Sequence, residues 1–312
     1  MKFVKLNWKT VLSFLVGVLV LYFLITQLDL KYASEIIRKI KLHYFLTAFV
    51  VYYLGFLVRA ERWRSLLRNN SLKGGLWEFT RIYYLSFFIN SLVPAKVGDL
   101  YRSHLTRKCF KFSPSKVFAT VIVERMSDIV FAIFVLTLYA FFLFPAIVPK
   151  GMVDFIIIVY IILIVVFISF WFVRRKKKFF LGLLPKKISK VVYDFGHTIT
   201  SSIKLKNLPR LIVLTSVIWF IEFLVFYFIF RSLNLGFPFY LIIFITLLAA
   251  VLSSVPITPA GLGAVEAGTA GFLILFGLDK NFAITSVFLV RLINYWSIVV
   301  IGAVVYFLSK KR

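Results

Sequence analysis

Apolar segments recur along the whole chain, and their length constrains the fold more than any other feature. A bilayer core is about 30 Å thick, so a helix of about 20 apolar residues crosses it. Of the 312 residues, 61% are hydrophobic, and a soluble domain of this size cannot bury so much apolar surface. We therefore predict one all-α, polytopic membrane domain over residues 1–312, with about seven or eight crossing helices. The segments lie at 10–26, 43–58, 82–93, 115–144, 153–173, 208–230, 239–255, 262–278 and 282–309.

The basic residues gather in the gaps between these segments. The chain has 38 Lys and Arg against 12 Asp and Glu, which gives a formal charge of +26. That charge would indicate nucleic acid in a soluble protein, but here it fits the positive-inside rule and contact with anionic lipid headgroups. We expect membrane lipids as partners and no nucleic acid. The two termini and residues 174–207 are the most basic, so we place them on the cytoplasmic side of the cell membrane.

Some gaps do not fit this topology easily. Residues 27–42 contain Lys31, Arg38, Lys39 and Lys41, yet the number of crossings places them outside. Segment 82–93 is short and has basic flanks, so a crossing there would place the bases of 95–116 outside. A re-entrant hairpin that dips in from the cytoplasm removes this conflict. Non-helical backbone at that depth is tolerated only where protein or a wet cavity covers it. Segments 239–255 and 262–278 either span twice or form a second hairpin.

A short motif occurs twice and supports the hairpins. Residues 94–98 and 259–263 both read Pro-Ala-x-x-Gly. Short apolar segments broken by Gly and Pro at matching positions in two halves indicate a transporter site. The motif predicts an inverted repeat with halves 1–150 and 151–312, although chance recurrence is the alternative. The predicted structural breaks are Pro94, Gly98, Pro256, Pro259, Gly261 and Gly263.

Charged residues inside apolar segments are costly, at about 2.5–3.5 kcal/mol each at mid-helix. Glu124 and Asp128 are four residues apart, so a helix places them on one face, while Arg125 points elsewhere. Arg291 needs an acid from another segment, and Glu266 is the expected partner. These charges either hold a bundle together as ion pairs or line a groove for a polar headgroup. For Glu222, alone in its segment, a hydrogen-bonded structural acid is expected.

Two basic segments raise different expectations. A helix that begins after the first break, with Asp99 and Arg102 near its start, suits a phosphate, because its amino end is positive. The alternative is an ordinary interfacial arginine. Residues 59–68 combine four arginines with Trp63, Leu66 and Leu67, a composition typical of an interfacial membrane anchor.

The chain offers no catalytic constellation. It has no nucleophile with a base and an orienting group, no phosphate loop of the Walker type and no cluster with metal-ligand spacing. Cys109 is the single cysteine. We expect no catalytic residues, no metal, no cofactor and no enzymatic activity.

Taken in order, several stretches resemble the transmembrane, flippase-like region of the lysylphosphatidylglycerol synthase (multiple peptide resistance factor) family. They are 59–67, 94–102, 119–128, 256–266 and the segment around Arg291. The resemblance implies a lipid-translocating module; the soluble synthase domain of that family has no counterpart here. Ala260 departs from the family, where a second glycine is usual. The residues that the resemblance assigns to a lipid path are Asp99, Arg102, Glu124, Arg125, Asp128, Glu266 and Arg291, beside Gly261 and Gly263.

The leading hypothesis is a flippase that moves a phospholipid or another polar-headgroup lipid between leaflets. Related modules occur fused to glycosyltransferases, so the alternative is a carrier or accessory subunit for polyprenyl-phosphate-linked glycolipids in cell-envelope glycan synthesis. A third hypothesis is a scaffold that recruits a cytoplasmic glycosyltransferase through residues 174–207. A glycosyltransferase or a lipid-synthesising enzyme is the expected protein partner.

Overall fold

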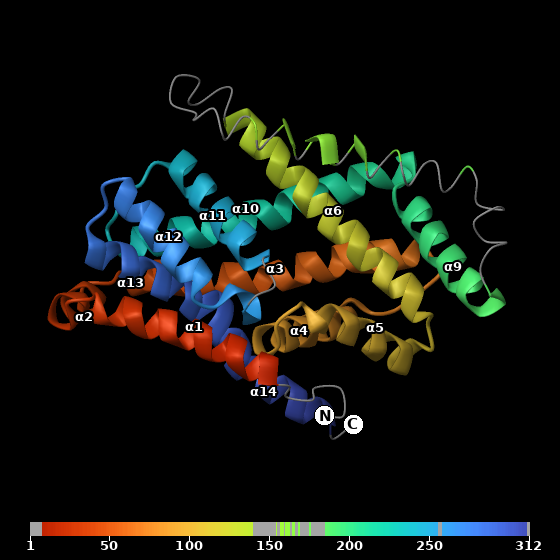
Figure 1. The fold of residues 1–312 in the computed structure, drawn as a ribbon, viewed down its shortest axis with the longest axis horizontal. Coiled ribbons are helices and arrows are strands. Elements are labelled where there is room, and N and C mark those ends of the chain that lie inside the picture. Colours follow the sequence, from red (N-terminus) through yellow and green to blue (C-terminus); the bar gives the residue numbers. More distant parts are fainter. Residues whose placement is uncertain are drawn as a thin grey trace. The chain divides into compact units, whose positions relative to one another are not determined.

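The computed structural model describes residues 8–139, 185–254 and 258–310, with scattered positions between 154 and 175. Within these ranges every regular element is a helix, which confirms the all-α fold (Figure 1). The elements are α1 (Trp8–Thr26), α2 (Leu30–Arg38), α3 (Leu42–Arg68), α4 (Leu76–Leu92), α5 (Val97–Phe110), α6 (Pro114–Leu138), α9 (Lys186–Ser202), η2 (Leu205–Asn207), α10 (Leu208–Ser232), α11 (Phe239–Ser254), η3 (Pro259–Gly261), α12 (Ala264–Leu275), α13 (Lys280–Arg291), η4 (Leu292–Trp296) and α14 (Ser297–Lys310).

Several of these helices suit a membrane. Among the described residues, three stretches are long and apolar enough to cross one: α3, Leu205–Ser232 and Lys280–Ser309. The pair α1 and α2 reaches the same standard together but bends by 87° between them, while α11 and α12 are shorter apolar helices. The protein is thus a multi-pass membrane protein, and the total of about seven or eight crossings stays a prediction.

The described residues form two compact units. The first unit contains Met1–Glu61, Gly74–Leu105 and Val217–Arg312, and the second contains Arg62–Lys73 and Thr106–Ser216. Helices α3, α5 and α10 contribute residues to both units. The two halves expected from the sequence motif are a different division, which stays a prediction.

In the first unit, helix α2 explains the basic gap at 27–42. Asp29 caps this helix, because its side chain accepts from the backbone N–H groups of Lys31 and Tyr32. Ala33 and Ile36 are buried against the protein, whereas Ile37 is 52% exposed. Lys31 and Arg38 therefore belong to a short amphipathic helix, the kind of element that lies at a membrane surface, and Lys39 and Lys41 follow its end.

Three gaps of the first unit meet one another. The backbone N–H of Asp29 donates to Oδ1 of Asn281 at 3.0 Å, and the backbone N–H of Lys41 donates to the carbonyl of Ser232 at 2.9 Å. Residues that precede and follow α2 thereby contact the start of α13 and the end of α10. The topology expected from the charges places these gaps on one side of the membrane, and their contact supports that assignment.

Glycine allows close packing around the second break. A Cβ at Gly17 of α1 would lie 3.0 Å from the Leu262 carbonyl, and a Cβ at Gly263 would lie 2.9 Å from Val20. Helix α1 therefore rests directly on η3 and the start of α12. Helices α12 and α13, coloured blue in Figure 1, pack against each other.

The second unit is built around α6 and α9, which pack against each other. Leu66, Val123 and Leu211 form its apolar cluster, with Ile199 of α9 beside them. The expected interfacial anchor at 59–68 is wrong: α3 continues to Arg68, and Trp63 is 0% exposed. Two of its four arginines, Arg59 and Arg62, face acids inside the protein and not headgroups.

Candidate functional site

The first Pro-Ala-x-x-Gly motif breaks the chain between α4 and α5. Ala95 and Lys96 have φ angles of 61° and 52°, in the left-handed region that non-glycine residues rarely adopt. Gly98 lies so close to α4 that an added Cβ would stand 2.0 Å from the Ser86 carbonyl oxygen. Its backbone N–H donates to Oδ1 of Asn90 at 2.8 Å. The break therefore folds α5 tightly back onto α4.

The second motif breaks the chain between α11 and α12 in a similar way. Ala260, Gly261 and Gly263 have φ angles of 46°, 70° and 87°. A Cβ at Gly261 would lie 2.8 Å from Cα of Ser253 in α11. In both motifs the alanine after the proline is left-handed, so the sequence likeness extends to the backbone. Of the predicted breaks, Pro256 lies outside the described residues.

Glu266 and Arg291 form a buried ion pair at the second break, as the sequence predicted. Arg291 Nε donates to Glu266 Oε1 at 2.6 Å, and Arg291 Nη2 donates to the Ala260 carbonyl at 3.2 Å. Oε2 of Glu266 accepts from the Gly263 backbone N–H at 2.8 Å. The side chains are only 2% and 5% exposed. The positive amino end of α12 is therefore neutralised by Glu266, and Arg291 ties α13 to the break.

Asp99 and Arg102 lie on α5 just after the first break. Asp99 stands in the first turn of the helix, and its Oδ1 accepts from Asn90 Nδ2 at 3.3 Å. Arg102 is 2% exposed, with its guanidinium 4.5 Å from the Tyr83 ring centre. This burial contradicts the alternative of an ordinary interfacial arginine. Each break thus has an acid in the first turn of the helix that follows and a buried arginine nearby.

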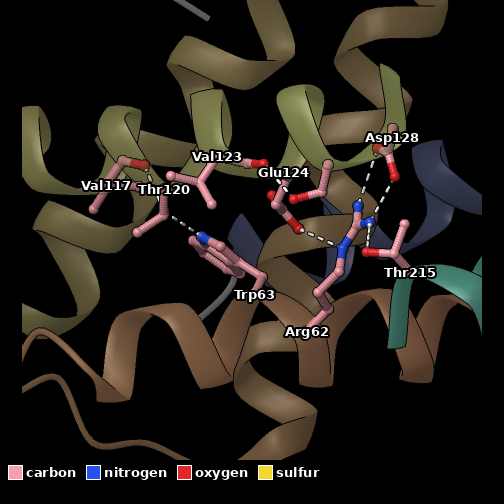
Figure 2. A network of polar contacts seen from close by, with 9 residues as sticks. Arg62, Trp63, Val117, Thr120, Val123, Glu124, Asp128 and Thr215 are labelled. Atoms are coloured by element: carbon pink, nitrogen blue, oxygen red, sulfur yellow. Dashed lines mark hydrogen bonds and ion pairs between the residues drawn. The ribbon is translucent and has the colours of Figure 1, made fainter. Parts of the chain in front are cut away.

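Arg62 is the centre of a polar network in the second unit, shown in Figure 2. Its Nη1 and Nη2 donate to the two carboxylate oxygens of Asp128 at 2.6 and 3.1 Å. Its Nε lies 3.6 Å from Oε1 of Glu124, and Nη1 also donates to Thr215 Oγ1 at 3.1 Å. Glu124 and Asp128 therefore share one face of α6, as their spacing predicted, while Arg125 is partly exposed between them.

Arg59 and Glu222 form a further pair in the first unit. Arg59 Nη2 donates to Glu222 Oε1, and the two side chains are 7% and 23% exposed. The guanidinium also lies 5.6 Å from the ring centre of Phe56 and 6.0 Å from that of Phe87. Glu222 is a hydrogen-bonded acid, as expected, and its partner comes from α3.

Comparison with known proteins bears directly on these elements. The model of the lysylphosphatidylglycerol synthase TM region matches residues 10–302 of this chain. The chain belongs to this family. The match contains both breaks, the three acid–arginine groups and all the residues that the resemblance assigned to a lipid path.

Archaeal relatives support the same assignment. The UPF0104 membrane protein MJ1078 of Methanocaldococcus jannaschii is 37% identical over 228 residues, which are 72% of this chain and 95% of that protein. The UPF0104 membrane protein PH1989 of Pyrococcus horikoshii is 22% identical, over 97% of this chain and 98% of that protein. A UPF0104 membrane protein of Methanothermobacter thermautotrophicus is 25% identical, over 96% of each chain. Two of these three membrane proteins match nearly the full length of this chain.

Sequence reasoning missed Arg59 and Arg62 as partners of the buried acids. A partial signal was present, because Glu124, Asp128 and Glu222 lie inside apolar segments and needed cations from elsewhere in the fold, but nothing in the sequence identified which cations. Among the described residues, no group of three or more His, Cys, Asp or Glu side chains is placed to hold a metal ion. The part that the charged residues of this TM region play in a lipid path stays a prediction.

Proposed function

We propose that this chain moves a phospholipid or another polar-headgroup lipid between the leaflets of its membrane. The observation that carries the proposal is the pair of left-handed Pro-Ala-x-x-Gly breaks, each set between short helices and each close to a buried arginine. Discontinuous helices of this kind form the substrate sites of many membrane transporters, because broken backbone exposes polar groups at membrane depth. Family membership supports the same function.

The charged groups suit a headgroup that carries a phosphate. A guanidinium binds carboxylate and phosphate oxygens with the same forked geometry, so Arg102 and Arg291 are the proposed contacts. Both are held by neighbours in the folded chain, Arg291 by Glu266 and Arg102 by the face of Tyr83. A headgroup that moves past such groups exchanges one polar partner for another, while its acyl tails stay in hydrocarbon. The large cost of a bare charge in the bilayer is thereby avoided.

We infer transport without chemical conversion. The sequence has no nucleophile with a base and an orienting group and no ATP-binding motif. Uphill movement would then depend on a proton or another gradient, or on a reaction that consumes the lipid. A cytoplasmic enzyme that makes the lipid, or a glycosyltransferase that uses it, is the proposed partner on the side of residues 174–207.

The test is a translocation assay in liposomes. Purified protein is reconstituted with fluorescent phospholipids of differing headgroup, and an added reductant destroys the label of the outer leaflet. Protein-dependent loss of the protected inner pool is expected, with Arg291→Ala and Glu266→Gln reducing it. Arg231→Ala is the matched control, because Arg231 is an exposed arginine at the end of α10. No loss with any phospholipid, from folded protein, would contradict phospholipid movement and favour a polyprenyl-phosphate-linked cargo.

A further inference from the structure

The helix that carries Arg291 changes its winding immediately after that residue. Helix α13 ends at Arg291, and the π-helix η4 (Leu292–Trp296) connects it to α14. A π-helical turn is wider than an α-helical turn and has poorer packing, and such turns occur frequently at functional sites. Because η4 lies beside the buried Glu266–Arg291 pair, its side chains are candidates for a functional role.

Tyr295 of η4 reaches the first break. Its hydroxyl donates to the backbone carbonyl of Ser91 at 3.1 Å. Ser91 lies in the last turn of α4, which ends at Leu92, so its carbonyl is among those that lose their helical partner at a helix end. Tyr295 supplies that partner just before Pro94. The hydroxyl of Tyr295 is thereby hydrogen-bonded to the start of the first break.

The same side chain also contacts the second break. The guanidinium carbon of Arg291 lies 4.8 Å from the Tyr295 ring centre, within the range of a cation–π interaction. Arg291 in turn donates to the Ala260 carbonyl, within the second break. A continuous set of contacts thus runs from Ser91 through Tyr295 and Arg291 to Ala260.

Helix α3 holds the π-helical turn in place. The hydroxyl of Tyr52 donates to the backbone carbonyl of Asn294 at 3.3 Å. The hydroxyl of Tyr53 shares a 2.7 Å hydrogen bond with Ser297 Oγ, at the start of α14. These bonds lie on both sides of Tyr295, so the ring is fixed by its flanking residues as well as by its own contacts.

These contacts are buried and are therefore costly to break. Ser91, Arg291 and Tyr295 are 3%, 4% and 2% exposed. Where water cannot replace a lost partner, a buried polar group stays with the partner it has, because an unsatisfied group is costly. A displacement of the α4 end therefore pulls on Tyr295, and a displacement of Tyr295 pulls on Arg291.

We propose that Tyr295 is a positioning residue that couples the two Pro-Ala-x-x-Gly breaks, so that a change at one is transmitted to the other. The inference rests on the proposed function in one respect: in a lipid translocator the coupling would make both breaks rearrange together around one headgroup. The contacts themselves are independent of the cargo.

The test measures whether a change at the first break reaches the second. The reporter is Thr258→Cys in a Cys109→Ser background, and the readout is the rate of alkylation by a membrane-permeant maleimide. Thr258 immediately precedes the second motif and is 6% exposed. The change at the first break is Gly98→Ala, which forces α5 away from Ser86. Asn90→Ala is a milder second change, because it creates no clash and removes only side-chain hydrogen bonds, those of Asn90 with the Gly98 N–H and with Asp99 Oδ1. It replaces Gly98→Ala if that variant does not fold.

With Tyr295 present, either change is expected to alter the alkylation rate by about threefold or more, the equivalent of one buried hydrogen bond. With Tyr295→Phe, which keeps the ring but removes the bond to Ser91, the rate is expected to stay within about twofold of its unperturbed value. Tyr306→Phe is the control, since it removes a hydroxyl from α14 and leaves Tyr295 in place. An equal response in the tyrosine and phenylalanine proteins would overturn the coupling.

A translocation arm separates this inference from the proposed function. Tyr295→Phe is expected to slow lipid movement by about threefold, with an unchanged elution profile on size exclusion. If alkylation responds through Tyr295 while the wild-type protein moves no lipid, the coupling stands and the proposed function fails. If lipid moves but Tyr295→Phe changes neither readout, the coupling fails and the proposed function stands.

Discussion

Arg62 compensates the buried acids of α6, and its removal is expected to be strongly destabilising. Arg62→Ala would leave Glu124, which is 2% exposed, and Asp128 without their shared cation. Loss of one member of a buried ion pair costs about 3–5 kcal/mol, because the remaining charge is uncompensated. We expect a marked fall in the thermal unfolding midpoint of the detergent-solubilised protein. Arg38→Ala, at an exposed arginine of α2, should leave the midpoint unchanged, and an equal effect of both variants would contradict the role of Arg62.

Ala260 is strained by its left-handed backbone, with φ of 46°. A left-handed conformation costs a non-glycine residue about 1–2 kcal/mol, and glycine loses about 0.4–1 kcal/mol more chain entropy on folding. Ala260→Gly is therefore expected to raise the free energy of unfolding by about 0.5 kcal/mol. Ala249→Gly, inside α11, should instead lower it by about 1 kcal/mol. Denaturant unfolding of both variants in detergent checks the prediction, and destabilisation by Ala260→Gly would refute the strain.

At the residue scale, sequence reasoning found pairs only where both partners stand inside apolar segments. Glu266 and Arg291 each had no partner nearby in the sequence, so each implied the other. Arg59 and Arg62 were assigned to headgroups because they stand in a basic run beside Trp63, the composition of an anchor. Their acids come from α10 and α6, and no local pattern identifies a partner so distant in sequence.

At the element scale, the breaks were predictable and several helix ends were not. Pro and Gly interrupt helices for local steric reasons, so both motifs were found from the sequence. Helix α3 continues to Arg68, beyond the apolar segment 43–58, and Arg59 and Arg62 in this extension pair with acids of α10 and α6, a tertiary effect. The basic gap at 27–42 conflicted with the predicted topology, and the sequence did not reveal that part of it is the helix α2, which buries Ala33 and Ile36 and leaves Lys31 and Arg38 exposed.

Helix α9 is expected to lie in the headgroup layer of the membrane. Ile188, Val191 and Val192 are 50%, 53% and 40% exposed and share one helical face, while Lys190 is exposed on another face. A helix with this pattern inserts its apolar face to the level of the acyl boundary. In a Cys109→Ser background, an environment-sensitive fluorophore at Val192→Cys should show blue-shifted emission in liposomes, and at Lys190→Cys emission typical of water. Equal emission at both positions would place the helix away from the bilayer.

At the scale of the whole molecule, the distribution of charge predicts which side each gap faces. The termini and residues 174–207 hold many bases, whereas the gap at 231–238 contains only Arg231. The positive-inside rule places the former in the cytoplasm and the latter outside. The bond from Lys41 to Ser232 joins the gap at 27–42 to the gap at 231–238, and the bond from Asp29 to Asn281 joins it to the start of α13. These contacts support a common side for the three segments.

Two single-cysteine proteins test this topology. Native Cys109 is exposed and follows the first break, in a gap that the charges place in the cytoplasm. Gly236 is exposed, with no atom within 4 Å of an added Cβ, so Gly236→Cys in a Cys109→Ser background gives a well-tolerated reporter on the opposite side. A membrane-impermeant maleimide added to intact cells should label Cys at position 236 at once and Cys109 only after permeabilisation. If Cys109 is labelled in intact cells, α4 crosses the membrane and does not re-enter. The bases that follow α4 would then face outward, against the positive-inside rule.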